Sequence, residues 1–84
     1  MRMVSISRNN DIAVGLRIAG IQSFFIKEDD EIKRKIKELS QDKNVGIISV
    51  TEEVYYIAKK EIEGIIENQD LPLIVKIPNS DKQK

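Results

Sequence analysis

The sequence predicts a single small α/β domain with a four-stranded parallel sheet and three helices. Along the chain, the apolar residues switch several times between a period of two, typical of strands, and a period near 3.6, typical of helices. The connections between these segments are short. One segment, Val45–Val50, is almost continuously apolar, as expected of a central strand covered on both faces. Strands and helices that alternate in this way form parallel sheets through crossover connections.

The first half of the chain contains two predicted strands and two predicted helices. Residues 3–7 alternate apolar and polar side chains, which predicts the first strand. Residues 11–19 carry apolar side chains at i, i+4 and i+7, which predicts a short helix that ends at Gly20. Residues 21–26 predict the second strand. A second helix is expected over residues 29–41, because acidic residues favour its N-terminus and an apolar stripe runs through it.

The second half contains two more predicted strands with one helix between them. After the strand at Val45–Val50, Thr51 can cap a third helix, whose apolar stripe runs from Val54 to Ile66. Leu73–Ile77 predicts the fourth strand, with a proline on either side. Residues 1–78 thus form one domain, and we expect the polar tail at residues 79–84 to be disordered.

The predicted topology leaves part of the sheet uncovered. We expect the flavodoxin-like strand order 2-1-3-4, and crossovers are right-handed in nearly all proteins. The first helix then lies alone on one face, and the third and fourth strands are partly bare on that side. Ser5 with Ser7, and Ile74 with Lys76, are the side chains expected there. Val14 and Ile18 lie off the first helix's main stripe, so the helix is either mostly buried or a docking surface.

Composition excludes several classes of function. The 84 residues contain no cysteine, which excludes disulfides, thiolate nucleophiles and Cys-ligated zinc. They contain no histidine, so the usual general base at neutral pH is missing. The formal net charge is zero, which argues against electrostatic binding of nucleic acid or anionic membranes. We therefore expect no catalytic residues, no bound cofactor and no metal site.

The turns that usually carry chemistry in α/β proteins lack the required residues. Residues 7–10 contain no glycine, so neither a P-loop nor a dinucleotide-binding fingerprint is present. Glu52 and Glu53 are adjacent and diverge by about 100° on a helix, which favours stabilisation of the helix N-terminus over paired acid/base work. The chain shows no secretory signal and no apolar run of membrane-spanning length, so we expect a cytoplasmic location.

Three segments together resemble the F subunit of the archaeal and bacterial V-type (A-type) rotary ATPases. They are Gly15–Gly20 (GLRIAG), Val45–Glu52 (VGIISVTE) and Leu71–Pro78 (LPLIVKIP), and their order and spacing cover almost the whole chain. The resemblance implies a non-catalytic component of the central rotor stalk. Such a component binds the coiled-coil shaft, which is the D subunit, and turns with it inside the ring of A and B subunits. It thereby helps to couple ATP hydrolysis or synthesis to proton or sodium translocation.

The chain departs from the family pattern in two places. The family commonly has Gly-Asp after the first strand, where this chain has Arg8-Asn9. Family members also continue into a C-terminal helix that reaches toward the A/B hexamer, and we expect this helix to be absent from a chain that ends at Lys84. The contact with the A/B hexamer that the resemblance implies would run through that helix.

The expected interface with the shaft lies on the first helix and the second, edge strand. Its predicted residues are Val14, Arg17, Ile18, Phe24 and Phe25. Two alternatives remain open at this point. One is a free-standing flavodoxin-like module for regulation or protein interaction, and the other is a carboxylate enzyme with Glu52 as its base.

Overall fold

A computed structural model of the chain describes residues 2–78, and the expected disordered tail lies outside these residues. The sheet contains four strands: β1 (Arg2–Ser7), β2 (Gln22–Phe25), β3 (Val45–Thr51) and β4 (Leu73–Ile77). The helices are α1 (Asn10–Ile18), α2 (Asp29–Ser40), α3 (Glu52–Ile57) and α4 (Lys59–Asn68). Each predicted strand is present, with ends within one residue of the expected ones.

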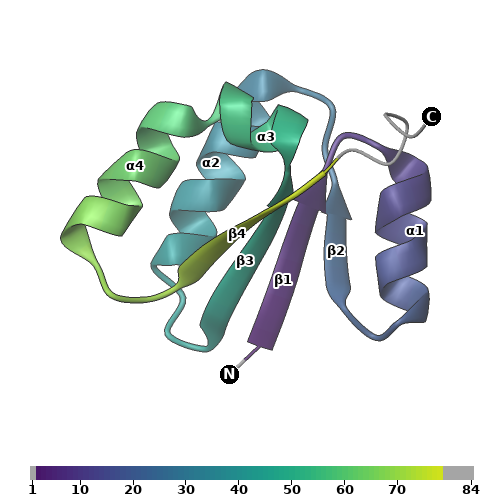
Figure 1. The fold of residues 1–84 in the computed structure, drawn as a ribbon, viewed down its shortest axis with the longest axis horizontal. Coiled ribbons are helices and arrows are strands. Elements are labelled where there is room, and N and C mark those ends of the chain that lie inside the picture. Colours follow the sequence, from purple (N-terminus) through teal and green to yellow (C-terminus); the bar gives the residue numbers. More distant parts are fainter. Residues whose placement is uncertain (1, 79–84) are drawn as a thin grey trace.

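All neighbouring strands pair in parallel, in the order β2-β1-β3-β4. The predicted flavodoxin-like order is therefore confirmed. Figure 1 shows α1 on one side of the sheet, against β1 and β2, while α2 and α4 lie on the other side. Since α1 reaches only two of the four strands, it divides its own side of the sheet into a covered half and an open half.

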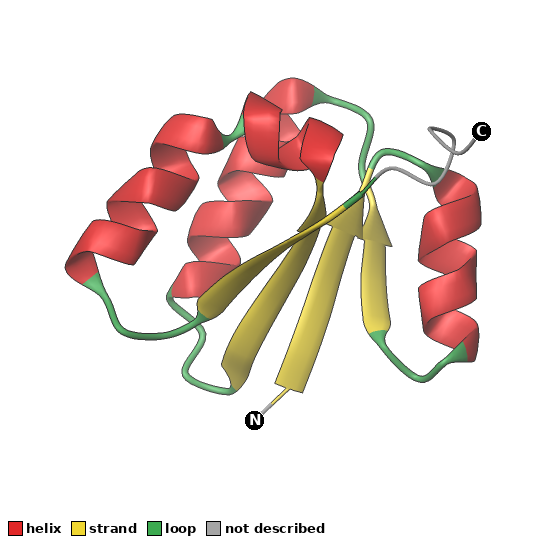
Figure 2. Cartoon of the chain, viewed as in Figure 1, coloured by secondary structure: helices red, strands yellow, loops and turns green. Residues whose placement is uncertain are grey.

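The third predicted helix is in fact two helices, so the prediction of three helices is wrong. At Ala58 the backbone leaves helical geometry, with φ −104° and ψ 27°. Figure 2 shows the short break between α3 and α4 and the change of direction there. The apolar stripe continues through the break, because Val54, Ala58 and Ile62 are all fully buried. The bend lets α3 pack on β3 and β1 while α4 packs on α2 and β4, which one straight helix does not do.

Side chains cap the two helices that begin at the carboxyl edge beside β1 and β3. The Oδ1 atom of Asn9 accepts hydrogen bonds from the N–H groups of Asp11 (2.8 Å) and Ile12 (3.2 Å). The hydroxyl oxygen of Thr51 accepts one from the N–H of Val54 at 3.3 Å, as the sequence predicted. These bonds satisfy donors that a helix N-terminus would otherwise leave unpaired.

Replacing Asn9 by alanine is expected to lower the free energy of unfolding by about 1 kcal/mol, because two N–H groups of α1 lose their acceptor. Urea denaturation followed by circular dichroism measures the change. Asn9→Ser serves as the control, since serine is an equally good cap. An alanine variant as stable as the serine variant would contradict the role of this cap.

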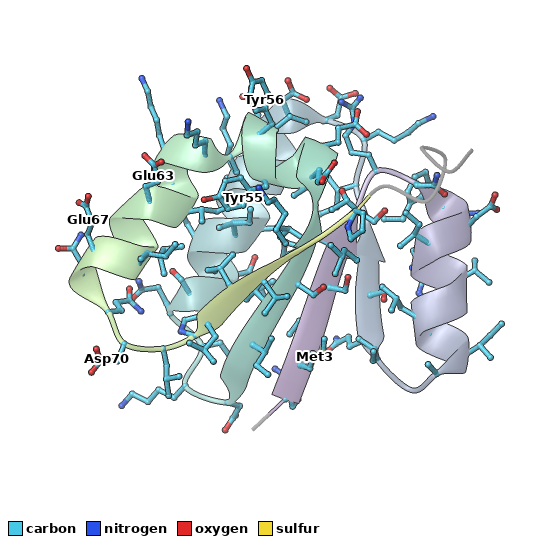
Figure 3. All side chains as sticks on the ribbon, in the orientation of Figure 1. Met3, Tyr55, Tyr56, Glu63, Glu67 and Asp70 are labelled. Atoms are coloured by element: carbon cyan, nitrogen blue, oxygen red, sulfur yellow. The ribbon has the colours of Figure 1, made fainter. Side chains whose placement is uncertain are left out.

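The hydrophobic core lies between the sheet and α2, α3 and α4. Val4, Ile6, Ile48 and Val50 supply the sheet's side of this core. Strand register places Ile74 beside Ile48 and Lys76 beside Val50. The side chains of Ile74 and Lys76 therefore lie on the face of the sheet that α2, α3 and α4 cover. The prediction that Ile74 and Lys76 share the bare face is therefore wrong. The Lys76 ammonium instead lies 4.9 Å from the centre of the Tyr55 ring. Figure 3 shows Tyr55 turned toward β4 while Tyr56 points outward.

The opposite face of the sheet is lined by small residues under α1 and by larger apolar ones beyond it. Ser23, Ser5 and Ser49 lie in register across three strands, and all are buried. The buried Ala13 of α1 packs on this side, where small partners let a helix approach closely. On β3 and β4 the same face carries Ile47, Leu73, Val75 and Ile77. Leu73 and Val75 remain exposed, so the predicted bare region exists, with different β4 residues.

Candidate functional site

A groove runs along the outer edge of β2, between α1 and α2. Its volume is about 460 Å³, and its lining includes three of the predicted interface residues, Arg17, Phe24 and Phe25. Glu31 and Lys35 of α2 lie on the opposite wall. The remaining two predicted residues, Val14 and Ile18, are on the exposed surface of α1 and not in the groove.

Arg17 is tied to the edge strand. Its Nε and Nη2 atoms donate hydrogen bonds of 3.3 and 3.2 Å to the carbonyl oxygen of Ser23. This oxygen belongs to β2, which has a neighbouring strand only on its β1 side. The free N–H and C=O groups of an edge strand can form hydrogen bonds with a strand of another chain. A charged side chain that binds one of these groups blocks such pairing. Arg17 therefore fixes α1 to the sheet and closes this edge to strand addition.

The two phenylalanines point to opposite faces of the sheet. Phe24 is in register with Ile6, is half-buried against the core and lies beneath the Lys35 ammonium, 4.6 Å from the ring centre. Phe25 is in register with Ser7 and is exposed on the side of α1. The structure thus brings Phe25 to the same side of the sheet as the α1 residues, and it separates Phe24 from them.

The outer surface of α1 carries exposed apolar residues, and no contact within the described chain accounts for them. Ile18 is 82% exposed and Val14 is 41% exposed. Beside them, a Cβ atom built on Gly15 would meet nothing within 4 Å, so no close packing within the described chain requires glycine there. Glycine inside a helix costs about 1 kcal/mol relative to alanine, and it lets another backbone come close. These three residues define what we call the α1 ridge.

Sequence reasoning missed the exposed residues of the open half-sheet. Leu73 and Val75 are exposed there, and Figure 3 shows the exposed Met3 of β1 on the same side of the sheet as α1. The alternation of Leu73, Val75 and Ile77 was the available signal. It did not identify the face, because an edge strand with apolar residues on both sides fits either orientation.

The carboxyl edge of the sheet holds an ion-pair cluster. Arg8 lies 3.2 Å from a carboxylate oxygen of Glu53 and 3.7 Å from one of Asp29. The groove at this edge is lined by Arg8 and residues 27–30, and Glu52 is not among its lining residues.

Within residues 2–78 no group of three or more acidic side chains is placed to hold a metal ion. In the same residues, no helix has both the length and the apolar character needed to cross a bilayer.

Comparisons with known proteins give a consistent result. The family model described as "ATP synthase (F/14-kDa) subunit" matches residues 4–84. The F subunit of the A-type ATP synthase of Thermoplasma acidophilum is 31% identical over 75 residues, which is 89% of this chain and 72% of that protein. The protein of the same name from Methanocaldococcus jannaschii is 29% identical over 90% of this chain and 74% of its own length. The one from Thermococcus kodakarensis is 28% identical over 96% and 78%.

Proposed function

Because the chain belongs to the ATP synthase (F/14-kDa) subunit family, we propose that it is a non-catalytic component of the central stalk of an A-type ATP synthase. In this role the domain lies on the cytoplasmic side, peripheral to the membrane, and braces the coiled-coil shaft formed by the D subunit. A stiffer shaft couples ATP synthesis or hydrolysis more tightly to the movement of protons or sodium ions. The contact with the A/B hexamer lies outside residues 2–78.

This proposal rests on the α1 ridge. Val14 and Ile18 are exposed apolar side chains one helical turn apart, and the open Gly15 lies beside them on the surface of α1. Such a surface fits another helix, because a small residue lets helix axes approach while its apolar neighbours fill the grooves beside it. A long coiled coil presents helical surface of this kind. The ion pairs of Arg8 and the zero net charge offer no comparable site for a charged ligand.

Phe25 and Arg17 would form the border of this interface. Phe25 is exposed on the same side of the sheet as α1 and adds aromatic area. Arg17 holds α1 against β2 through Ser23, so its expected contribution is to the position of the ridge. Phe24 lies on the other face, and its expected contribution to binding is therefore the smallest of the five predicted residues.

Binding to the shaft is tested by co-expression with the D subunit from the same genome, followed by size-exclusion chromatography with mass detection. We expect a one-to-one complex, and Ile18→Ala is expected to weaken it about tenfold or more, as for a buried interface residue. Ile66→Ala is the matched control, since Ile66 is also an exposed helical isoleucine but lies on α4. Both variants should keep the thermal stability of the parent chain.

Two outcomes would overturn the proposal. If the parent chain and the shaft elute separately, the alternative of a free-standing interaction module is favoured. If Ile66→Ala weakens the complex as much as Ile18→Ala, the shaft binds elsewhere on the domain.

A further inference from the structure

A groove runs between α2 and α4, on the side of the sheet opposite α1. The two helices pack side by side (Figure 1), and two hollows of about 530 and 310 Å³ lie between them and at the start of α4. Both hollows have Lys60 and Glu61 in their linings, so they form one continuous surface. We call this surface the α2/α4 groove. Its charged lining residues are Lys33, Lys37, Lys59, Lys60 and Glu61.

The α2/α4 groove is basic, although the formal net charge of the whole chain is zero. Its lining contains four lysines and one glutamate. The charged residues that α2 contributes to the groove are all lysines, while Glu31 and Glu38 of the same helix line the groove beside β2. Glu63 and Glu67 of α4 line neither hollow, and Figure 3 shows them on the outer side of that helix. The zero net charge is therefore an average that conceals one positively charged surface.

The lysines of the groove have no ion-pair partner among the described residues. The ion pairs within residues 2–78 involve the basic residues Arg2, Arg8 and Lys35, and all three lie outside the groove. In addition, Lys59 and Lys60 lie in the first turn of α4, where the helix dipole disfavours a positive charge. A negatively charged partner would relieve both the repulsion among the lysines and this unfavourable position.

A second feature indicates that the partner is a helix. Gly64 lies midway along α4 in the wall of the groove, and a Cβ atom built on it would meet nothing within 4 Å. Glycine destabilises a helix interior relative to alanine, and no packing within the described chain requires glycine here. A small residue in a groove wall lets the axis of another helix come close. The exposed Tyr56 and the half-buried Ile57 add apolar surface near the start of α4.

We propose that the α2/α4 groove binds an acidic amphipathic helix of a partner protein. Lys33 and Lys37 are one helical turn apart on α2, about 6 Å along its axis. Carboxylates at positions i and i+4 of a bound helix have the same spacing, so they can pair with these two lysines. A further carboxylate then meets Lys60 on the opposite wall. Since a single exposed ion pair contributes little, the affinity depends on several such contacts made together.

Other anionic partners fit the groove less well. Glu61 lies in the lining among the lysines, and it would repel a phosphate placed beside it. A helix can present a neutral or basic residue at that point, whereas a nucleic-acid backbone carries a negative charge at every step. Glu63 and Glu67 also border the groove on the outer side of α4, which leaves no extended basic face for a duplex or a membrane.

The groove is separate from the shaft contact proposed above. It lies on the opposite side of the sheet from the α1 ridge, so both surfaces can be occupied at the same time. This inference therefore goes beyond the stalk role and does not rest on it.

The test is a fluorescence-anisotropy titration of the 84-residue chain with a labelled synthetic peptide. The peptide has about 20 residues, long enough to form a helix in water, with glutamates at i and i+4 and leucines on the same face. A matched peptide has glutamine in place of each glutamate. We expect saturable binding of the acidic peptide, about tenfold or more tighter than that of the glutamine peptide. Raising the salt concentration from about 0.05 to about 0.5 M should weaken the binding of the acidic peptide about tenfold.

Variants of the chain locate the binding site. Lys33→Gln combined with Lys37→Gln should weaken binding of the acidic peptide about tenfold. The control combines Lys27→Gln with Lys43→Gln, which removes the same charge from exposed lysines outside the groove and should change the dissociation constant by less than about twofold. Gly64→Leu should also abolish binding, because its side chain fills the groove. Its melting temperature should not fall, since leucine favours a helix and has room there.

Four results would overturn the proposal. They are failure of the acidic peptide to bind, equal losses in the groove variant and its charge-matched control, tighter binding of a single-stranded oligonucleotide of equal charge through the same lysines, and salt-sensitive self-association of the chain that the groove variant abolishes. Sedimentation velocity detects the last of these. Ile18→Ala, on the α1 ridge, should bind the peptide as the parent chain does, so that a failure of the stalk role and a failure of this inference are distinguishable.

Discussion

Replacing Ile36 by alanine is expected to lower the free energy of unfolding by about 2–5 kcal/mol. Ile36 lies on α2, is fully buried and belongs to the core cluster between the sheet and α2, α3 and α4. Alanine removes three carbon atoms and leaves a cavity that the surrounding side chains fill only in part. A domain has about 5–15 kcal/mol of total stability, so this one change removes a large share of it.

Thermal and urea denaturation of the Ile36→Ala variant measure this loss. We expect the melting temperature to fall by about 10 °C or more, at about 4–8 °C per kcal/mol for a domain of this size. Ile66→Ala is the control with the same chemical change at a 54% exposed helical site, and it should stay within about 0.5 kcal/mol of the parent chain. Equal losses in the two variants would mean that the core is not where the structure places it.

Replacing Ala13 by leucine is expected to cost about 1–3 kcal/mol and to displace α1 from the sheet. Ala13 is the one residue of α1 that is fully buried, and the sheet beneath α1 carries serines in place of larger side chains. A leucine there needs space that close packing does not provide. Since the α1 ridge moves with its helix, the same change should also weaken the contact with the shaft proposed for that ridge.

Ala19→Leu is the matched control for this effect, because Ala19 is exposed at the C-terminal end of α1. Urea denaturation compares the two variants, and hydrogen exchange of the α1 amides reports displacement of the helix. If Ala13→Leu is as stable as Ala19→Leu, α1 is held to the sheet by its hydrogen bonds, such as those of Arg17, and not by close packing.

The sequence was sufficient for the order of elements and the strand order. Each strand and helix has its own apolar period, and right-handed crossovers leave few topologies. The break at Ala58 could not be predicted in the same way. The apolar stripe from Val54 to Ile62 keeps a helical period through the break, and what changes is the backbone geometry at one buried residue.

The orientation of the edge strands was the weakest part of the prediction. Both β2 and β4 are short and carry apolar side chains on both faces, so either alternate set could be assigned to either side. Ile74 and Lys76 were placed on the wrong face for this reason, and the adjacent Phe24 and Phe25 were grouped although they point apart. Only the pairing with β1 and β3 decides these faces.

The position of β1 has a consequence for synthesis of the protein. Of the four strands, β1 is synthesised first, and it lies inside the sheet, between β2 and β3. A nascent chain that ends before β3 can pair β1 only with the four-residue β2, and an isolated strand pair is at best marginally stable in water. The core residues that α3 and α4 supply are translated later still. The domain therefore folds only after its later elements have been synthesised, and the earlier segments depend on remaining unaggregated until then.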